Sequence, residues 1–133
     1  MAPRDFLRGS LIRALHSFPV NRGTPDRAAI RKSVEVLQSG EALVMFPEGE
    51  CSETGDPLPL LPGAALIIRM ADVPVVCCGI VGTRKIMPYG KLIPRPSFGG
   101  VSATFGKPRA FEKNATQDEI LGWVRSQFDE LTR

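Results

Sequence analysis

Two long stretches of the chain repeat apolar residues every three or four positions, the spacing that places side chains on one face of a helix. The first lies between Thr24-Pro25, a typical helix start, and Gly40, a typical helix end. The second follows Thr116 and Glu119, whose spacing fits a capping box, and covers about residues 117–131. Each pattern predicts an amphipathic helix.

Shorter patterns complete the expected fold. Residues 4–15 predict a basic amphipathic helix, and residues 62–71 predict a short helix. The apolar runs at 42–46, 73–81 and 100–105 predict strands, the first two of them buried. Because strands and helices alternate, the predicted fold class is α/β, with a mostly parallel sheet covered by helices.

The size and composition of the chain indicate one domain. The chain has 133 residues, of which 43% are hydrophobic, so residues 1–133 can form one ordinary core. The three cysteines, two of them adjacent as Cys77 and Cys78, do not form a disulfide framework and favour a reducing compartment. No apolar run approaches the roughly 20 residues of a membrane span. We therefore expect a cytoplasmic chain that is not secreted.

Basic residues are concentrated in two parts of the chain. Residues 1–32 hold seven basic and two acidic residues, and residues 84–113 hold seven basic residues and one acidic residue. This asymmetry favours an anionic partner: a phosphorylated metabolite, a lipid surface or nucleic acid. A basic face that is merely exposed to solvent would give the same sequence pattern. Nucleic acid is disfavoured, because one Trp and one Tyr offer little base stacking. The arginines and leucines of 4–15 suit a peripheral position on the inner membrane face. Packing of that helix on the sheet is the alternative.

The apolar run at 42–46 ends in Pro47, Glu48 and Gly49. In a parallel α/β sheet, ligands bind beyond the carboxyl ends of the strands, so this position predicts a binding site. A plain turn would explain the same residues.

Several blocks around this turn occur in an order that resembles the glycerolipid acyltransferases of the lysophosphatidate-acylating, PlsC-type class. The blocks are Phe-Pro-Val-Asn-Arg-Gly at 18–23, Phe-Pro-Glu-Gly at 46–49 with Ser52, Pro-Gly-Ala-Ala at 62–65, and Val-Pro-Val-Val-Cys at 73–77. Phe-Gly-Lys-Pro at 105–108 resembles a late turn of that family, so the resemblance covers about residues 10–112.

The resemblance implies transfer of a fatty acyl group from acyl-CoA or acyl carrier protein to a lysophosphatidate-like acceptor, in phospholipid biosynthesis. It implies that Arg22 contacts the acceptor's phosphate, because a guanidinium can pair with two phosphate oxygens. Glu48, with Gly49 and Ser52, would complete the acceptor site, and Glu48 would orient a basic group or a glycerol hydroxyl. Neither a metal nor another cofactor is implied.

The chain also departs from the family pattern. It lacks the His-x-x-x-x-Asp block that precedes the arginine block, so we expect an N-terminally incomplete domain that is inactive alone and has no assigned catalytic residue. Its one histidine, His16, is better explained by packing or helix capping. Glu50 and Cys51 stand where the family has Thr-Arg, so either Arg84, Lys85 or Arg95 compensates, or the acceptor differs.

Two other functions remain open at this point. The chain could be a non-catalytic remnant that keeps the acyltransferase scaffold and binds a phospholipid or a partner protein. A cysteine enzyme would pair Cys51 with His16, but no supporting motif surrounds either residue.

Overall fold

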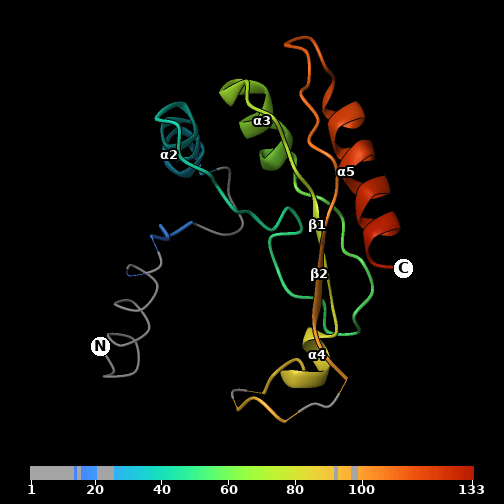
Figure 1. Cartoon of the computed structure of the whole chain (residues 1–133). Coiled ribbons are helices and arrows are strands. Elements are labelled where there is room, and N and C mark those ends of the chain that lie inside the picture. The colour runs from blue at the N-terminus through green and yellow to red at the C-terminus, as the bar shows by residue number, and fades with distance from the viewer. Residues whose placement is uncertain (1–13, 15, 21–25, 92, 97–98) are drawn as a thin grey trace.

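The computed structural model describes residues 14, 16–20, 26–91, 93–96 and 99–133. Their elements, in chain order, are α2 (Arg27–Gln38), α3 (Pro62–Ala71), β1 (Cys78–Val81), α4 (Thr83–Ile86), β2 (Ser102–Phe105) and α5 (Gln117–Leu131). Helices α2, α3 and α5 stand side by side, and the ribbon of β1 and β2 extends from them towards α4 (Figure 1). Helix α3 contacts both α2 and α5, and α5 also contacts β1. Within the described ranges, no helix has the length and apolar character needed to cross a membrane.

Helix α2 occupies the place that the apolar spacing predicts. Its first turn is capped by Asp26, whose carboxylate accepts a hydrogen bond from the Ala29 amide at 3.0 Å. Gly40 follows the helix with φ of +86°, a conformation that glycine adopts without steric cost. The helix is thus confirmed, while the predicted start at Thr24-Pro25 lies outside the described residues.

Helix α5 begins at the predicted cap. The Thr116 hydroxyl accepts a hydrogen bond from the Glu119 amide at 3.2 Å. The Glu119 carboxylate forms an ion pair with Arg109, also at 3.2 Å, from the segment that precedes the helix. Of the two hydrogen bonds of a capping box, the one from the Glu119 amide to the Thr116 hydroxyl is therefore present. The Glu119 carboxylate contributes a tertiary contact with Arg109.

The core lies between α3 and α5. Ile120 is fully buried and packs in a cluster with Ala65, Ile68 and Ala115. Helix α3 has the predicted bounds: Pro62 occupies its first turn, and Asp72 ends it in the left-handed conformation with φ of +55°. The apolar stripe of α5 thus points into the core, as its spacing predicts.

The sheet is smaller than expected. Strands β1 and β2 pair antiparallel, with Cys78 opposite Phe105, and a single bridge joins Val75 to Arg109. The mostly parallel character of the predicted sheet is not confirmed, because the described residues hold only this two-stranded antiparallel pair.

The prediction of a buried strand at 42–46 is wrong. These residues have no strand assignment, and the side chains of Val44 and Phe46 are 84% and 75% exposed. An apolar run becomes a core strand only where another strand accepts its hydrogen bonds and another layer covers its side chains. In the described part of the chain, no strand pairs with this run.

The two faces of the β1–β2 ribbon differ in cover. Cys77 and Gly79 are buried, and a Cβ atom added to Gly79 would lie 2.7 Å from both the Cβ and the carbonyl oxygen of Leu131, in the last turn of α5. On the opposite face, Ile80 and its cross-strand diagonal neighbour Phe105 are 46% and 71% exposed. Helix α5 therefore covers one face at Gly79, whereas Thr104, opposite Gly79, is exposed, and the other face carries exposed apolar side chains.

Candidate functional site

The residues at 46–49 form a tight turn. The Gly49 amide donates to the Phe46 carbonyl at 3.0 Å, and Gly49 has φ of +73°. The Pro47 carbonyl accepts a hydrogen bond from the Leu61 amide at 2.7 Å, which brings the turn next to the start of α3. A Cβ atom on Gly49 would collide with the Leu61 side chain. Glycine is thus favoured here by its positive φ, and a Cβ atom would in addition displace the end of the Leu61 side chain.

Glu48 is held by an arginine that the sequence analysis did not consider. Its carboxylate oxygen Oε1 lies 3.6 Å from Nη1 of Arg125, in the middle of α5. The two side chains are 26% and 29% exposed, so the pair is less screened than a surface ion pair. The other terminal nitrogen of Arg125, Nη2, donates a hydrogen bond to the Leu58 carbonyl. One guanidinium therefore connects the turn, the end of the following loop and the C-terminal helix.

Ser52 organises the loop that follows the turn. Its hydroxyl accepts a hydrogen bond from the Gly55 amide at 2.8 Å and lies 3.4 Å from the Thr54 hydroxyl. Arg84, from α4, donates to the Glu53 carbonyl at 2.9 Å. The predicted site residues Glu48, Gly49 and Ser52 thus lie on one loop, which Arg84 and Arg125 contact from different helices.

The charges around this loop are mixed. Its acidic residues Glu50 and Glu53 are exposed. A hydrogen bond to the Glu53 carboxylate raises the pKa of Tyr89 above its ordinary value, and the negative charge of Glu53 adds to the effect. Of the three cations considered as replacements for the family's Thr-Arg, Arg84 contacts this loop, through its hydrogen bond to the Glu53 carbonyl.

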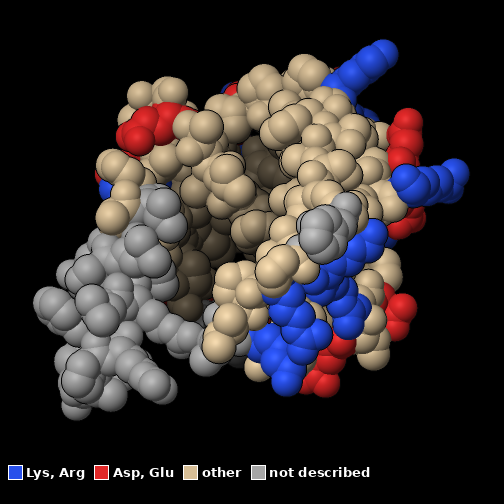
Figure 2. All heavy atoms as spheres, turned by 60° about the horizontal axis from the view of Figure 1, so that its bottom comes forward, with Lys and Arg blue, Asp and Glu red and all other residues tan. Residues whose placement is uncertain are grey.

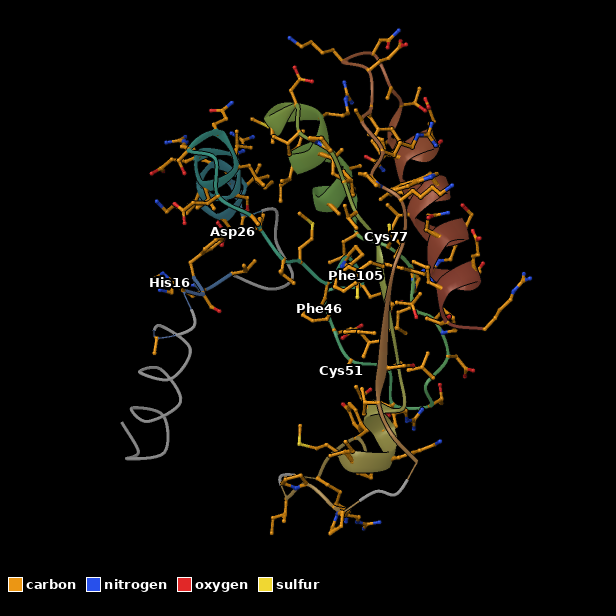
Figure 3. All side chains as sticks on the ribbon, viewed as in Figure 1. His16, Asp26, Phe46, Cys51, Cys77 and Phe105 are labelled. Atoms are coloured by element: carbon orange, nitrogen blue, oxygen red, sulfur yellow. The ribbon has the colours of Figure 1, made fainter. Side chains whose placement is uncertain are left out.

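Two other candidate residues, Arg22 and His16, come from the N-terminal part of the chain. Arg22 lies outside the described residues, so its expected contact with Glu48 stays a prediction. His16 is exposed with φ of +55°, and Figure 3 shows it away from Cys51, which lies next to the β1–β2 ribbon. A nucleophilic pair of Cys51 and His16 is therefore not supported. Among the residues that are placed, no group of three His, Cys, Asp or Glu could hold a metal ion.

Cys77 and Cys78 differ in their surroundings. Cys77 is 4% exposed, and burial raises the pKa of its thiol. Cys78 is only half-buried. The burial predicted for the strand at 73–81 thus holds fully for Cys77 and partly for Cys78.

Comparison with known proteins decides the family. The family model described as Acyltransferase matches residues 4–81, more than half of the chain. The chain belongs to the acyltransferase family. This acyltransferase domain is 35% identical over 87 residues to the 1-acyl-sn-glycerol-3-phosphate acyltransferase of Bacillus subtilis (strain 168), covering 63% of the domain and 43% of that protein. It is also 35% identical over 101 residues to the enzyme of the same name from Streptococcus pneumoniae (strain ATCC BAA-255 / R6), covering 75% of the domain and 34% of that protein.

The fold agrees with the family assignment. The acyltransferase domain superimposes on the crystal structure of the 1-acyl-sn-glycerophosphate acyltransferase PlsC from Thermotoga maritima with a TM-score of 0.69 and 26% identity. The match covers 76% of the domain and 43% of the Thermotoga chain. The domain thus has the PlsC-type fold and spans less than half the length of the relatives it matches here.

Arg125 lies beyond residues 4–81, the part that the family model matches. The sequence signal that could have drawn attention to it is its place on α5, one residue after the buried Val124 and therefore at the margin of the apolar stripe. An arginine at that margin can reach across to a neighbouring segment with its long stem packed along apolar surface.

Proposed function

We propose that the chain provides the acceptor-binding part of an enzyme that transfers a fatty acyl group to a lysophosphatidate-like glycerol phosphate. The donor would be acyl-CoA or acyl carrier protein, and the product would enter phospholipid biosynthesis. The family match and the names of the two bacterial relatives support this reaction class. The observation that carries the proposal is the Phe46–Gly49 turn. In this turn the Glu48 carboxylate, which forms an ion pair with Arg125, lies next to Gly49, whose φ is positive.

The site residues have different chemical tasks in this proposal. Arg22 pairs with the acceptor's phosphate through two guanidinium nitrogens. Glu48 accepts a hydrogen bond from a glycerol hydroxyl, since an ionised carboxylate can only accept. Ser52 shapes the adjacent loop through its hydrogen bond from Gly55. The acyl transfer itself needs a base that takes the proton of the attacking hydroxyl, and we assign this role to none of the described residues.

Binding of the acceptor can be measured directly by calorimetric titration with glycerol 3-phosphate and with lysophosphatidate. The substitution Arg22→Ala should weaken binding of either ligand by about 1.5–3 kcal/mol, because a charge-assisted hydrogen-bonded contact is lost. Arg22→Lys should recover part of the loss, since lysine keeps the charge and lacks the fork. Arg31→Ala, an exposed arginine on α2, is the control. Equal affinities of the unaltered and Arg22→Ala proteins would remove the phosphate role.

The alternative of a non-catalytic scaffold that binds a phospholipid predicts binding without turnover. We expect the chain alone to form no acylated product from acyl-CoA and lysophosphatidate. Steady product formation that His16→Ala abolishes would contradict this expectation and assign the base to His16.

We also propose that the domain works as a peripheral protein on the inner, anionic face of a membrane. The end of the molecule around α4 carries exposed apolar side chains, among them Met87 at 54% and Ile93 at 80% exposure. Four exposed basic residues surround them: Arg84, Lys85, Lys91 and Arg95. Lys and Arg side chains gather at this end of the molecule, with acidic side chains at its margin (Figure 2). Apolar side chains that enter the interface and cations that meet anionic lipid are the two components of peripheral attachment.

Sedimentation with vesicles at low salt tests the membrane proposal. The chain should sediment more with anionic than with neutral vesicles, and the double substitution Lys91→Glu and Arg95→Glu should lower the bound fraction. Lys32→Glu, on α2, is the matched control. Equal sedimentation with both kinds of vesicle would contradict the proposal.

A further inference from the structure

Arg125 makes two contacts that meet at the candidate acceptor site. Its Nη1 atom lies 3.6 Å from Oε1 of Glu48, and its Nη2 atom donates to the carbonyl of Leu58. Glu48 and Leu58 lie near opposite ends of the loop that links the turn to α3. The same loop is closed by the hydrogen bond from the Leu61 amide to the Pro47 carbonyl, at 2.7 Å. The arginine therefore fixes a loop whose ends already meet.

The side chain of Arg125 is anchored by its place on α5. Arg125 lies one residue after the buried Val124 and one turn after Leu121, on the helix that contributes Ile120 to the core. Its side chain is 29% exposed, so most of it is packed against protein. A guanidinium anchored in this way can hold a partner more precisely than a surface arginine, whose free rotamers must be ordered on contact.

The contact leaves part of the Glu48 carboxylate open to a ligand. The ion pair joins Nη1 of Arg125 to Oε1 of Glu48, and 26% of the Glu48 side chain stays exposed. A glutamate side chain has three rotatable bonds, and a fixed first oxygen sets the direction in which the second one points. A held carboxylate binds a hydroxyl with a smaller loss of conformational entropy than a free one.

We propose that Arg125 is a positioning residue of the acceptor site, which holds Glu48 so that its second carboxylate oxygen accepts a hydrogen bond from the glycerol hydroxyl of the acceptor. This inference rests on the proposed acceptor-binding function. Arginine suits the task because its fork reaches Glu48 and Leu58 with two different nitrogens, whereas a lysine ammonium is a single point of contact. The C-terminal helix thereby contributes to the site as well as to the core.

The inference is tested by calorimetric titration of glycerol 3-phosphate into the unaltered chain and four variants: Arg125→Ala, Arg125→Lys, Glu48→Gln and the double variant Arg125→Ala with Glu48→Gln. We expect Arg125→Ala to weaken binding about tenfold and Arg125→Lys to recover part of the loss. The double variant should bind no more weakly than Glu48→Gln alone, because Arg125 acts through Glu48. Arg31→Ala, exposed on α2, should bind like the unaltered chain.

A purely structural role is separated by measuring unfolding in urea for the same proteins. If Arg125 only stabilised the fold, its removal would lower the unfolding midpoint and leave the affinity of the folded chain unchanged. Unchanged affinity of Arg125→Ala, or fully additive losses in the double variant, would overturn the proposal.

Failure of the acceptor-binding function would give a different result. The unaltered chain would then bind no glycerol 3-phosphate. Hydrogen exchange of the Leu61 amide would in that case test separately whether Arg125 positions the loop. Faster exchange at Leu61 in Arg125→Ala than in Arg31→Ala would support positioning by Arg125. Equal exchange would overturn it.

Discussion

Substitution of Ile120 by alanine tests whether the small core between α3 and α5 sustains the fold. Ile120 is fully buried among Ala65, Ile68 and Ala115. Removing three carbon atoms from such a position costs about 2–5 kcal/mol, because apolar contacts are lost and a cavity remains. Two of the surrounding side chains are alanines, which are too short to move into the space. The cavity should therefore persist, which favours the upper part of that range.

A smaller term acts in the opposite direction. Alanine favours a helix more than isoleucine does, by roughly 0.5 kcal/mol, and Ile120 lies in the first turn of α5. The net loss in the free energy of unfolding should thus be about 3–4.5 kcal/mol. For a chain of this size that corresponds to a fall in the melting temperature of roughly 11–16 °C, if unfolding is two-state.

The assay is urea unfolding followed by tryptophan fluorescence. Trp123, the one tryptophan of the chain, packs edge-on against Phe111 with ring centroids 5.3 Å apart, so its emission reports on the contact between α5 and the preceding segment. Ile93→Ala removes the same atoms from a side chain that is 80% exposed and should change stability by less than about 0.5 kcal/mol. A loss below about 1 kcal/mol for Ile120→Ala, or one no larger than for Ile93→Ala, would refute this account of the core.

Three further predictions concern single positions. Gly49→Ala should lower the unfolding midpoint in urea and weaken glycerol 3-phosphate binding, because the residue has φ of +73° and its Cβ would meet Leu61; an unchanged midpoint would contradict the strain. Thr116→Ala should cost about 1 kcal/mol in urea unfolding through loss of the α5 cap, and a neutral result would show that the cap contributes nothing. Thiol labelling at neutral pH should modify Cys51 well before Cys77, since Cys51 is exposed whereas burial raises the pKa of Cys77 and lowers its reactive thiolate fraction. Equal labelling rates for the two thiols would contradict this expectation. Because the folded-state pKa of Cys77 is raised, its contribution to stability should also be lost as the pH rises past the ordinary thiol value, and urea unfolding midpoints that do not fall with rising pH would contradict that loss.

The helices were predictable because their signals are local. The apolar spacing of α5, the Thr116 cap and Pro62 at the start of α3 each depend on residues within a few positions of one another. Local backbone preference and apolar spacing agreed there, so tertiary packing did not have to override either one. The shape of the core could be inferred from the same stripes.

The strand at 42–46 shows where local signals are insufficient. An apolar run indicates that its side chains can be buried, but the strand or helix that would cover them comes from other parts of the chain. The site was likewise predictable only in part. Glu48, Gly49 and Ser52 follow one another on one loop and could be proposed from their order, whereas Arg125 comes from a helix far along the chain. Its contact depends on how α5 packs, which no short motif encodes.

The close approach of α5 to Gly79 has a consequence for comparisons across the family. A Cβ atom at this position would lie 2.7 Å from the Leu131 Cβ and equally close to the Leu131 carbonyl oxygen, which no change of side chain at Leu131 can remove. A larger residue at the equivalent of Gly79 is therefore compatible only with a displaced final helix. In alignments of related sequences, glycine at this strand position should thus accompany a docked α5, and its replacement should identify the relatives whose last helix follows another path.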